Sequence, residues 1–121
     1  MACACLMTVS CQNNEKENTP EAATERFAKA FYTADFPHMY QYTTKRSEIV
    51  VQQIQTAMKE NPENLDKMKS TKVEFVETTV QGQTDSTAIC ACSLKLDGEP
   101  LTSTWELLKE DDLWKVTLVL P

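Results

Sequence analysis

Residues 84–120, TDSTAICACSLKLDGEPLTSTWELLKEDDLWKVTLVL, decide the fold of this chain because apolar and polar side chains alternate along them. Asp97-Gly98 predicts a two-residue hairpin turn, since a type I′ turn needs positive φ at both central positions. Glu110-Asp111-Asp112 predicts a second turn. Connections this short join antiparallel neighbours. The stretch therefore predicts three consecutive antiparallel strands, at residues 84–96, 101–109 and 113–120.

A fourth strand is expected immediately upstream, at residues 72–80, where Val73 and Phe75 point to one face. We expect the segment Gln81-Gly82-Gln83 to form the turn that follows it. One face of the resulting sheet is apolar and predicts its packing side, with Ala88, Cys90, Cys92, Leu94, Trp105, Leu107, Trp114, Val116 and Leu118. The carboxylates Glu74, Asp85 and Glu106 fall on the polar face.

The half of the chain before the strands has helical periodicity. Thr19-Pro20-Glu21 combines a hydroxyl N-cap, a proline at the first position and an acid near the positive helix end. This helix is expected to run to about Ala34, with Phe27 and Phe31 as a core ridge. Three further helical segments are expected: a short one capped by Asp35, one from Ser47 with Val50, Ile54, Ala57 and Met58 inward, and, after the break at Asn61-Pro62, a last turn at residues 63–68.

Helices followed by an amphipathic sheet predict an α+β domain over residues 19–121, with N-terminal helices packed on a curved four-stranded antiparallel sheet. The chain has 121 residues, and its 41% hydrophobic and 25% charged residues are typical of a globular domain. Its formal net charge of −6 argues against a nucleic-acid partner. No segment approaches the roughly 20 apolar residues of a membrane-spanning helix.

The first residues, MACACLMTVSC, are apolar and end at a small residue followed by cysteine. This pattern resembles a bacterial lipoprotein signal with the lipobox Thr8-Val9-Ser10-Cys11, although Thr8 replaces the usual leucine and the basic n-region is missing. We therefore expect residues 1–11 to be a signal remnant, residues 12–18 a polar tether, and Cys11 the lipidated residue. The alternative is an ordinary disordered N-terminus with chance cysteines.

The remaining cysteines, Cys90 and Cys92, lie two apart on one predicted strand, with Cα atoms about 6.6 Å apart. That distance is at the far edge of disulfide geometry, so we interpret both as small buried apolar residues. A zinc site that pairs them with Cys3 and Cys5 is disfavoured, because structural zinc prefers wider spacing between its cysteines. The sequence predicts no metal and no cofactor.

Candidate site residues gather around the second helical segment: Tyr32, Asp35, His38, Tyr40 and Tyr42. The rings either seal the seam between helix and sheet or line the mouth of a pocket, to which Trp105 would also contribute. In a proton-transfer enzyme, His38 or Asp35 would be the base and Tyr32 or Tyr40 the hydroxyl donor. Asp35 is also explained as a helix cap, and no further catalytic signature accompanies the cluster.

Two segments resemble one known family. The start TPEAATERFAKAFYTADFPHMYQYTT and the end LLKEDDLWKVTLVLP are similar to the opening helices and closing hairpin of the bacterial lipoprotein family called domain of unknown function 4878. Asp112 stands where that family has a glycine. The resemblance covers residues 19–120 and implies a cone-like fold of the nuclear transport factor 2-like (cystatin-like) superfamily. It implies no activity, because members of this superfamily include enzymes, binders and scaffolds.

Three functions follow as hypotheses. The first is a binding or accessory domain of the bacterial cell envelope, tethered to the membrane through Cys11 and contacting a small ligand or an envelope protein. The second is a small pocket enzyme. The third is a structural module that forms homodimers through the mildly polar sheet face, which carries Thr87, Ser93, Thr102 and Thr104.

Overall fold

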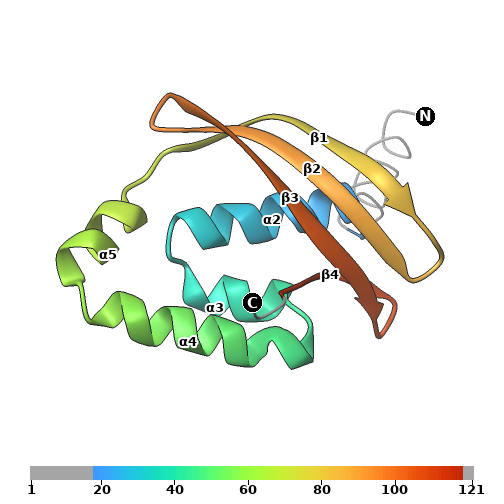
Figure 1. Ribbon diagram of the computed structural model, residues 1–121, viewed down its shortest axis with the longest axis horizontal. Helices are drawn as coiled ribbons and strands as arrows, with labels where there is room; N and C mark the ends of the chain where they lie inside the picture. The colour runs from blue at the N-terminus through green and yellow to red at the C-terminus, as the bar shows by residue number, and fades with distance from the viewer. Residues whose placement is uncertain (1–17, 119–121) are drawn as a thin grey trace, which may run out of the picture.

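The computed structural model describes residues 18–118, which form an α+β domain (Figure 1). The helical half contains α2 (Pro20–Tyr32), α3 (Phe36–Tyr42), the 3₁₀ turn η1 (Lys45–Ser47), α4 (Glu48–Lys59) and α5 (Pro62–Lys69). The sheet half contains β1 (Val73–Gln83), β2 (Thr87–Leu96), β3 (Glu99–Glu110) and β4 (Leu113–Thr117). The strands pair antiparallel in the order β1-β2-β3-β4. The predicted fold class is confirmed, whereas the predicted signal remnant and residues 12–17 of the tether lie outside the described residues.

Side-chain caps explain where the helices begin. The Ala22 N–H donates to Thr19 Oγ1 at 3.1 Å at the start of α2, and the Asn64 N–H donates to Asn61 Oδ1 at 3.3 Å at the start of α5. Both caps satisfy backbone donors that have no partner within a helix. α2 ends at Tyr32 rather than at Ala34, because Ala34 has a φ of 55° and leaves the helical region.

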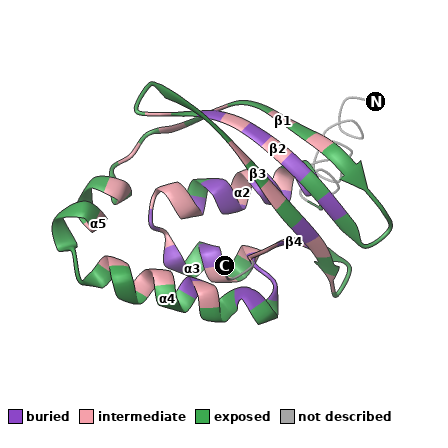
Figure 2. Cartoon of the chain, in the orientation of Figure 1, coloured by how far each residue is buried: buried purple, intermediate pink, exposed green. Residues whose placement is uncertain are grey.

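The core lies between α2 and the inner face of the sheet (Figure 2). Phe27 is fully buried, and its ring meets the Trp105 indole edge-on at a centroid distance of 5.1 Å. Phe31 meets the same indole at 5.5 Å. Aromatic rings therefore occupy the space between α2 and β3, and the predicted Phe27/Phe31 core ridge is confirmed.

Two local predictions were wrong. Gln81-Gly82-Gln83 continues β1 through a bulge at Gln81, between Val80 and Gly82, and the connection instead lies at residues 84–86. Thr84 makes that turn, because its hydroxyl accepts from the Ser86 and Thr87 N–H groups at 3.3 and 3.0 Å. In α4, Ile54 and Met58 pack against the core as predicted, but Ala57 is exposed and the buried residue is Val51, because the helix is rotated slightly relative to the predicted stripe.

The outer edge of β4 is covered at both ends. The Asn18 side-chain amide donates to the Asp112 carbonyl at 3.0 Å and accepts from the Trp114 N–H at 3.3 Å. Further along, the Thr44 N–H donates to the Val116 carbonyl at 2.9 Å, within a parallel bridge between Thr43 and Val116. These contacts satisfy backbone groups that an edge strand otherwise presents to other chains.

Both tight hairpins have positive φ at their two central residues. Asp97 and Gly98 have φ values of 50° and 86°, as the Asp-Gly pair predicts. Asp111 and Asp112 have φ values of 52° and 64°, so this turn adopts the same conformation without a glycine. An L-residue in the left-handed region is strained, although aspartate tolerates it better than most.

Asp112→Gly is therefore expected to raise the free energy of unfolding by about 0.5–1 kcal/mol, because glycine adopts positive φ without a steric penalty. Urea denaturation followed by far-ultraviolet circular dichroism measures the change. The matched control is Asp85→Gly in the β1–β2 connection, which removes the same charge at a residue outside the left-handed region and should give no stabilisation. Equal stabilisation by both variants would show that charge, and not backbone strain, is responsible.

Candidate functional site

The structure brings Asp35, His38 and Tyr42 together on the solvent side of α3. His38 Nδ1 lies 2.6 Å from Asp35 Oδ2, and the His38 ring stacks on the Tyr42 ring at 6.0 Å. Asp35 also caps α3, since the His38 N–H donates to its Oδ1 at 3.5 Å. The His38 and Asp35 side chains are 54% and 41% exposed. This pair therefore stands in water and lacks the apolar wall that tunes a general base.

The other candidates lie elsewhere. The Tyr40 hydroxyl donates to Gln55 Oε1 on α4 at 3.0 Å. Tyr32 packs edge-on against Phe31 at 5.1 Å and belongs to a different core cluster, around Ala28 and Cys92. The Trp105 indole N–H donates to Ser103 Oγ at 2.9 Å while its ring packs in the core. None of these three residues lines the cleft that contains His38.

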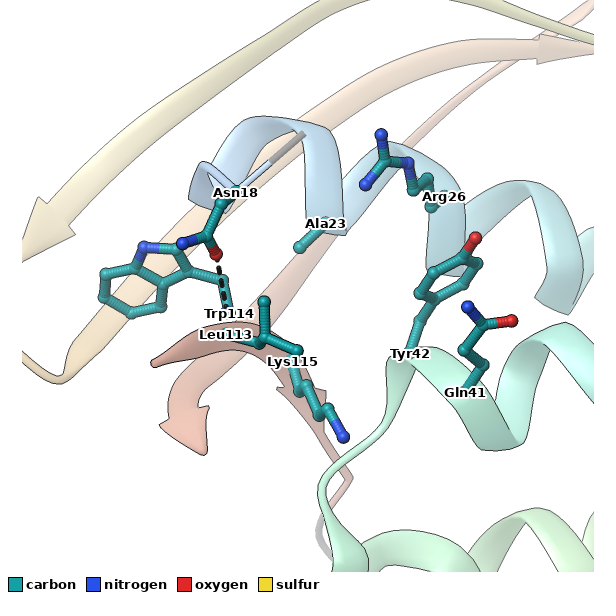
Figure 3. A pocket seen from close by; sticks show the side chains of 8 residues that line it. All are labelled: Asn18, Ala23, Arg26, Gln41, Tyr42, Leu113, Trp114 and Lys115. Atoms are coloured by element: carbon teal, nitrogen blue, oxygen red, sulfur yellow. Dashed lines mark hydrogen bonds between the residues drawn. The ribbon is translucent and has the colours of Figure 1, made fainter. Parts of the chain in front are cut away.

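A cleft of about 380 Å³ opens between α2, α3 and β4, which we call the α2–β4 cleft (Figure 3). Ala23 and Arg26 lie above it on α2, whereas Leu113 and Lys115 face Gln41 and Tyr42 across it. A smaller cleft of about 220 Å³, which contains His38 and Lys29, adjoins it and shares Arg26 and Tyr42 with it. The two clefts therefore have the Arg26 and Tyr42 side chains as common lining.

The described residues that line the α2–β4 cleft include two cations and no carboxylate. The Arg26 guanidinium lies over the Tyr42 ring, 6.0 Å from its centroid, which favours a cation–π attraction. Asn18 closes one end, where its amide is held by Asp112 and Trp114. Sequence reasoning identified Tyr42 but missed Arg26, Leu113 and Lys115. The only signal was the three-residue spacing of Ala23 and Arg26, which places both on one face of α2.

Cys90 and Cys92 are free thiols that are fully buried on the inner face of β2. Burial raises the pKa of both thiols, and the negative charges of Glu21 near Cys90 and Glu25 near Cys92 act in the same direction. Hydrogen bonds from Thr24 and Thr78 oppose part of the shift. Both cysteines therefore have the character of structural residues and not of nucleophiles.

We expect Cys90 and Cys92 to react with iodoacetamide at pH 8 at least about tenfold more slowly in the native protein than in urea, because the reactive thiolate is disfavoured and buried. Peptide-resolved mass spectrometry separates them from Cys3, Cys5 and Cys11. Rapid labelling of the native protein would contradict the buried placement.

The same pKa shifts predict how stability depends on pH. Because folding raises the pKa of both thiols, the native state binds more protons than the unfolded state above the usual thiol pKa. The free energy of unfolding should therefore fall as pH rises through that range.

Within residues 18–118, no group of three or more histidine, cysteine or acidic side chains is arranged to hold a metal. The same range contains no helix long and apolar enough to cross a membrane.

No protein-family model matches the chain. No curated protein matches it by sequence. The structure of the chain, by contrast, is similar to a solved one. A crystal structure described as an NTF2-like transpeptidase from Campylobacter jejuni superposes with a TM-score of 0.60 at 20% sequence identity, covering 84% of this chain and 99% of that one. The chain therefore has the nuclear transport factor 2-like fold, and the cone predicted from the sequence is confirmed. An identity this low establishes the fold alone.

Proposed function

We propose that this protein is a non-catalytic binding domain that holds its ligand or partner in the α2–β4 cleft. The observation that carries the proposal is that this cleft is open, whereas the region between α2 and the sheet is filled by side chains. Phe27, Phe31 and Trp105 fill the region between α2 and β3, whereas the cleft beside α2 is open and lined by polar and apolar side chains. A site of this volume, with a few converging polar groups, is typical of small-ligand recognition.

Catalysis is less well supported than binding. The His38–Asp35 pair is exposed and is engaged in capping α3. Acyl transfer, the class to which transpeptidation belongs, needs an accessible nucleophile beside a base. Cys90, Cys92 and Ser47 are all buried, and no contact links any of them to His38 within the described part of the chain. The description of the structural neighbour therefore gives no mechanism for this chain.

We further propose that the domain is a lipoprotein of the cell envelope, anchored through Cys11. Support comes from the lipobox-like sequence and from the resemblance to the domain of unknown function 4878. Expression of the full chain in a bacterium should yield a mature protein that begins at Cys11 and carries acyl mass. A native protein that begins at Met1 without lipid would reject the anchor and leave the cleft proposal unaffected.

Site-specific photocrosslinking tests the cleft in the envelope. Leu113 lines the cleft and is 50% exposed, so a benzoylphenylalanine at this position should crosslink to the ligand or partner. The matched control is Ile89 on β2, which is 41% exposed and pairs with Glu106 away from the cleft. Crosslinks from Ile89 to a second copy of the chain, with none from Leu113, would replace the binding proposal with the homodimer hypothesis.

A further inference from the structure

Two segments of the chain cover the outer edge of β4, and the α2–β4 cleft lies beside the stretch between them (Figure 3). At one end, the Asn18 side chain accepts a hydrogen bond from the Trp114 N–H. At the other end, Thr43 forms a parallel bridge with Val116. The cleft is lined by the three consecutive β4 residues 113–115. Neighbouring side chains of a strand point to opposite faces, so a cleft lined by three in a row lies along the edge of the strand and reaches its backbone.

The backbone carbonyl of Trp114 points away from the sheet at this edge. In an antiparallel pair, the N–H and C=O of one residue point to the same side of the strand. The Trp114 N–H points away from β3, because it donates to Asn18, while the N–H of the opposite residue, Lys109, donates to the Ser86 carbonyl at 2.9 Å. The Trp114 carbonyl therefore also points away from β3, and none of the hydrogen bonds among residues 18–118 reaches it.

The chain itself stops short of this carbonyl because α3 ends beside it. If the parallel pairing at Thr43 and Val116 continued by one step, the Tyr42 N–H would donate to the Trp114 carbonyl. Tyr42 is instead the last residue of α3, and its N–H bonds within the helix. The Trp114 carbonyl is thus the acceptor at which strand pairing along this edge ends.

The walls of the cleft suit a peptide as well as this acceptor does. Leu113, which is half-exposed, and the Tyr42 ring offer apolar surface that a ligand side chain would remove from water. Gln41 contributes a side-chain amide, which can donate to a ligand carbonyl. Trp114 is only 7% exposed, and a carbonyl in such surroundings gains more from a positioned donor than one on an open surface.

We infer that the α2–β4 cleft binds an extended peptide, whose backbone N–H donates to the Trp114 carbonyl while a side chain packs on Leu113 and Tyr42. This inference rests on the proposed function, since it names the ligand class of the same cleft. Main-chain pairing at a strand edge supplies affinity, and the pocket for the side chain supplies specificity. A ligand of the same shape that lacks the backbone N–H should therefore bind more weakly.

The test observes the Trp114 carbonyl directly by nuclear magnetic resonance. The sequence contains two tryptophans, so the full chain labelled with ¹³C at its tryptophan carbonyls gives two signals, assigned through the amides of Glu106 and Lys115 that follow them. The probe is the tripeptide threonine-leucine-threonine, acetylated and amidated so that it carries no charge. We expect the Trp114 signal to move to higher frequency as the probe is added, because its oxygen accepts a new hydrogen bond. The Trp105 carbonyl, in the interior of the sheet, is the control and should stay unchanged.

Ester analogues of the probe identify the donor. Each analogue replaces one backbone N–H of the tripeptide with an oxygen, which removes a donor and keeps the shape. We expect one analogue to bind about tenfold more weakly and to leave the Trp114 carbonyl signal in place. The other analogues, which keep that donor, should lose less than about threefold.

Leu113→Ser should weaken binding of the tripeptide by about fivefold, because the ligand side chain loses apolar surface to pack on. The matched control is Leu101→Ser on β3, which is 37% exposed, pairs with Leu94 and lies outside the cleft. It should change the affinity less than about twofold. Unchanged spectra of the free variants confirm that each of them folds.

If the tripeptide shifts the amide signals of Tyr42 and Leu113 while the Trp114 carbonyl signal stays in place, pairing with the β4 edge is overturned and the binding cleft remains. Equal affinity of the tripeptide and all its ester analogues has the same meaning. If the tripeptide does not bind while Leu113 crosslinks to a partner in the envelope, the inference is also overturned and the proposed function remains. Absence of both peptide binding and crosslinking would overturn the proposed function itself.

Discussion

Replacement of Phe27 by alanine is expected to lower the free energy of unfolding by about 3–5 kcal/mol. The ring is fully buried, stacks with Phe31 at 5.9 Å and meets the Trp105 indole edge-on at 5.1 Å. The substitution removes the transfer free energy of the ring and leaves a cavity between α2 and β3. Domains of this size are stable by only about 5–15 kcal/mol, so the variant should be close to unfolding at physiological temperature.

Urea denaturation of Phe27→Ala, followed by tryptophan fluorescence, measures the loss, because Trp105 reports directly on the same cluster. The control is Ile89→Ala on the exposed side of β2, for which we expect a change below about 0.5 kcal/mol. A loss below about 1 kcal/mol at Phe27 would mean that the interior is loosely packed. The region between α2 and the sheet would then be a candidate ligand cavity, contrary to our proposal.

Replacement of Ser47 by alanine should cost about 1–3 kcal/mol although it removes a single oxygen. Ser47 is buried, and its hydroxyl accepts from the Leu118 N–H at 2.8 Å and lies 2.7 Å from Thr44 Oγ1 and 3.3 Å from Thr117 Oγ1. Alanine would leave the Leu118 N–H and the Thr44 hydroxyl without this partner in a buried environment. The end of β4 should therefore detach before the rest of the sheet.

Amide hydrogen exchange separates this local effect from global destabilisation, since Leu118 should lose more protection than residues of β2. The matched control is Ser70→Ala at the end of α5, whose hydroxyl donates to the Asp66 and Lys67 carbonyls on the exposed surface. That change should cost less than about 0.5 kcal/mol. Similar losses for both serines would contradict the importance of the buried hydroxyl cluster.

The sequence predicted those parts of the fold that depend on local chemistry. Alternating residues around Cys90, Trp105 and Trp114 defined the sheet, and Asp97-Gly98 defined its central turn. It misplaced the first turn, because Gly82 is a turn signal in the sequence but here continues β1 next to a bulge at Gln81, and the Thr84 hydroxyl makes the turn instead. In α4 the predicted residues Ile54 and Met58 do pack against the core, but Val51 is the buried residue and Ala57 is exposed, because the packing of α4 against α3 sets its rotation.

The site was less predictable than the fold. Asp35 and His38 are three residues apart, so their contact follows from one helical turn. The α2–β4 cleft joins Arg26 to Lys115, which are 89 positions apart in the sequence, and their proximity depends on how α3 reaches the edge of β4. That arrangement depends on the Thr43–Val116 bridge and on the buried Ser47 hydroxyl, neither of which has a sequence signature.

Asn18 fixes the place where a pulling force on the N-terminal side of the chain would act on the domain. Its side-chain amide bonds to the Asp112 carbonyl and the Trp114 N–H, as the N–H and C=O of one residue in a parallel strand would, and α2 begins two residues later. Tension applied through the preceding residues would thus divide between the β4 edge and the first turn of α2. Asn18→Ala would remove the hydrogen bonds to the β4 edge, and the force needed to separate the start of α2 from the sheet would fall. α2 and β4 also form two walls of the α2–β4 cleft, with α3 as the third, so a displacement of α2 from β4 would change the width of the cleft.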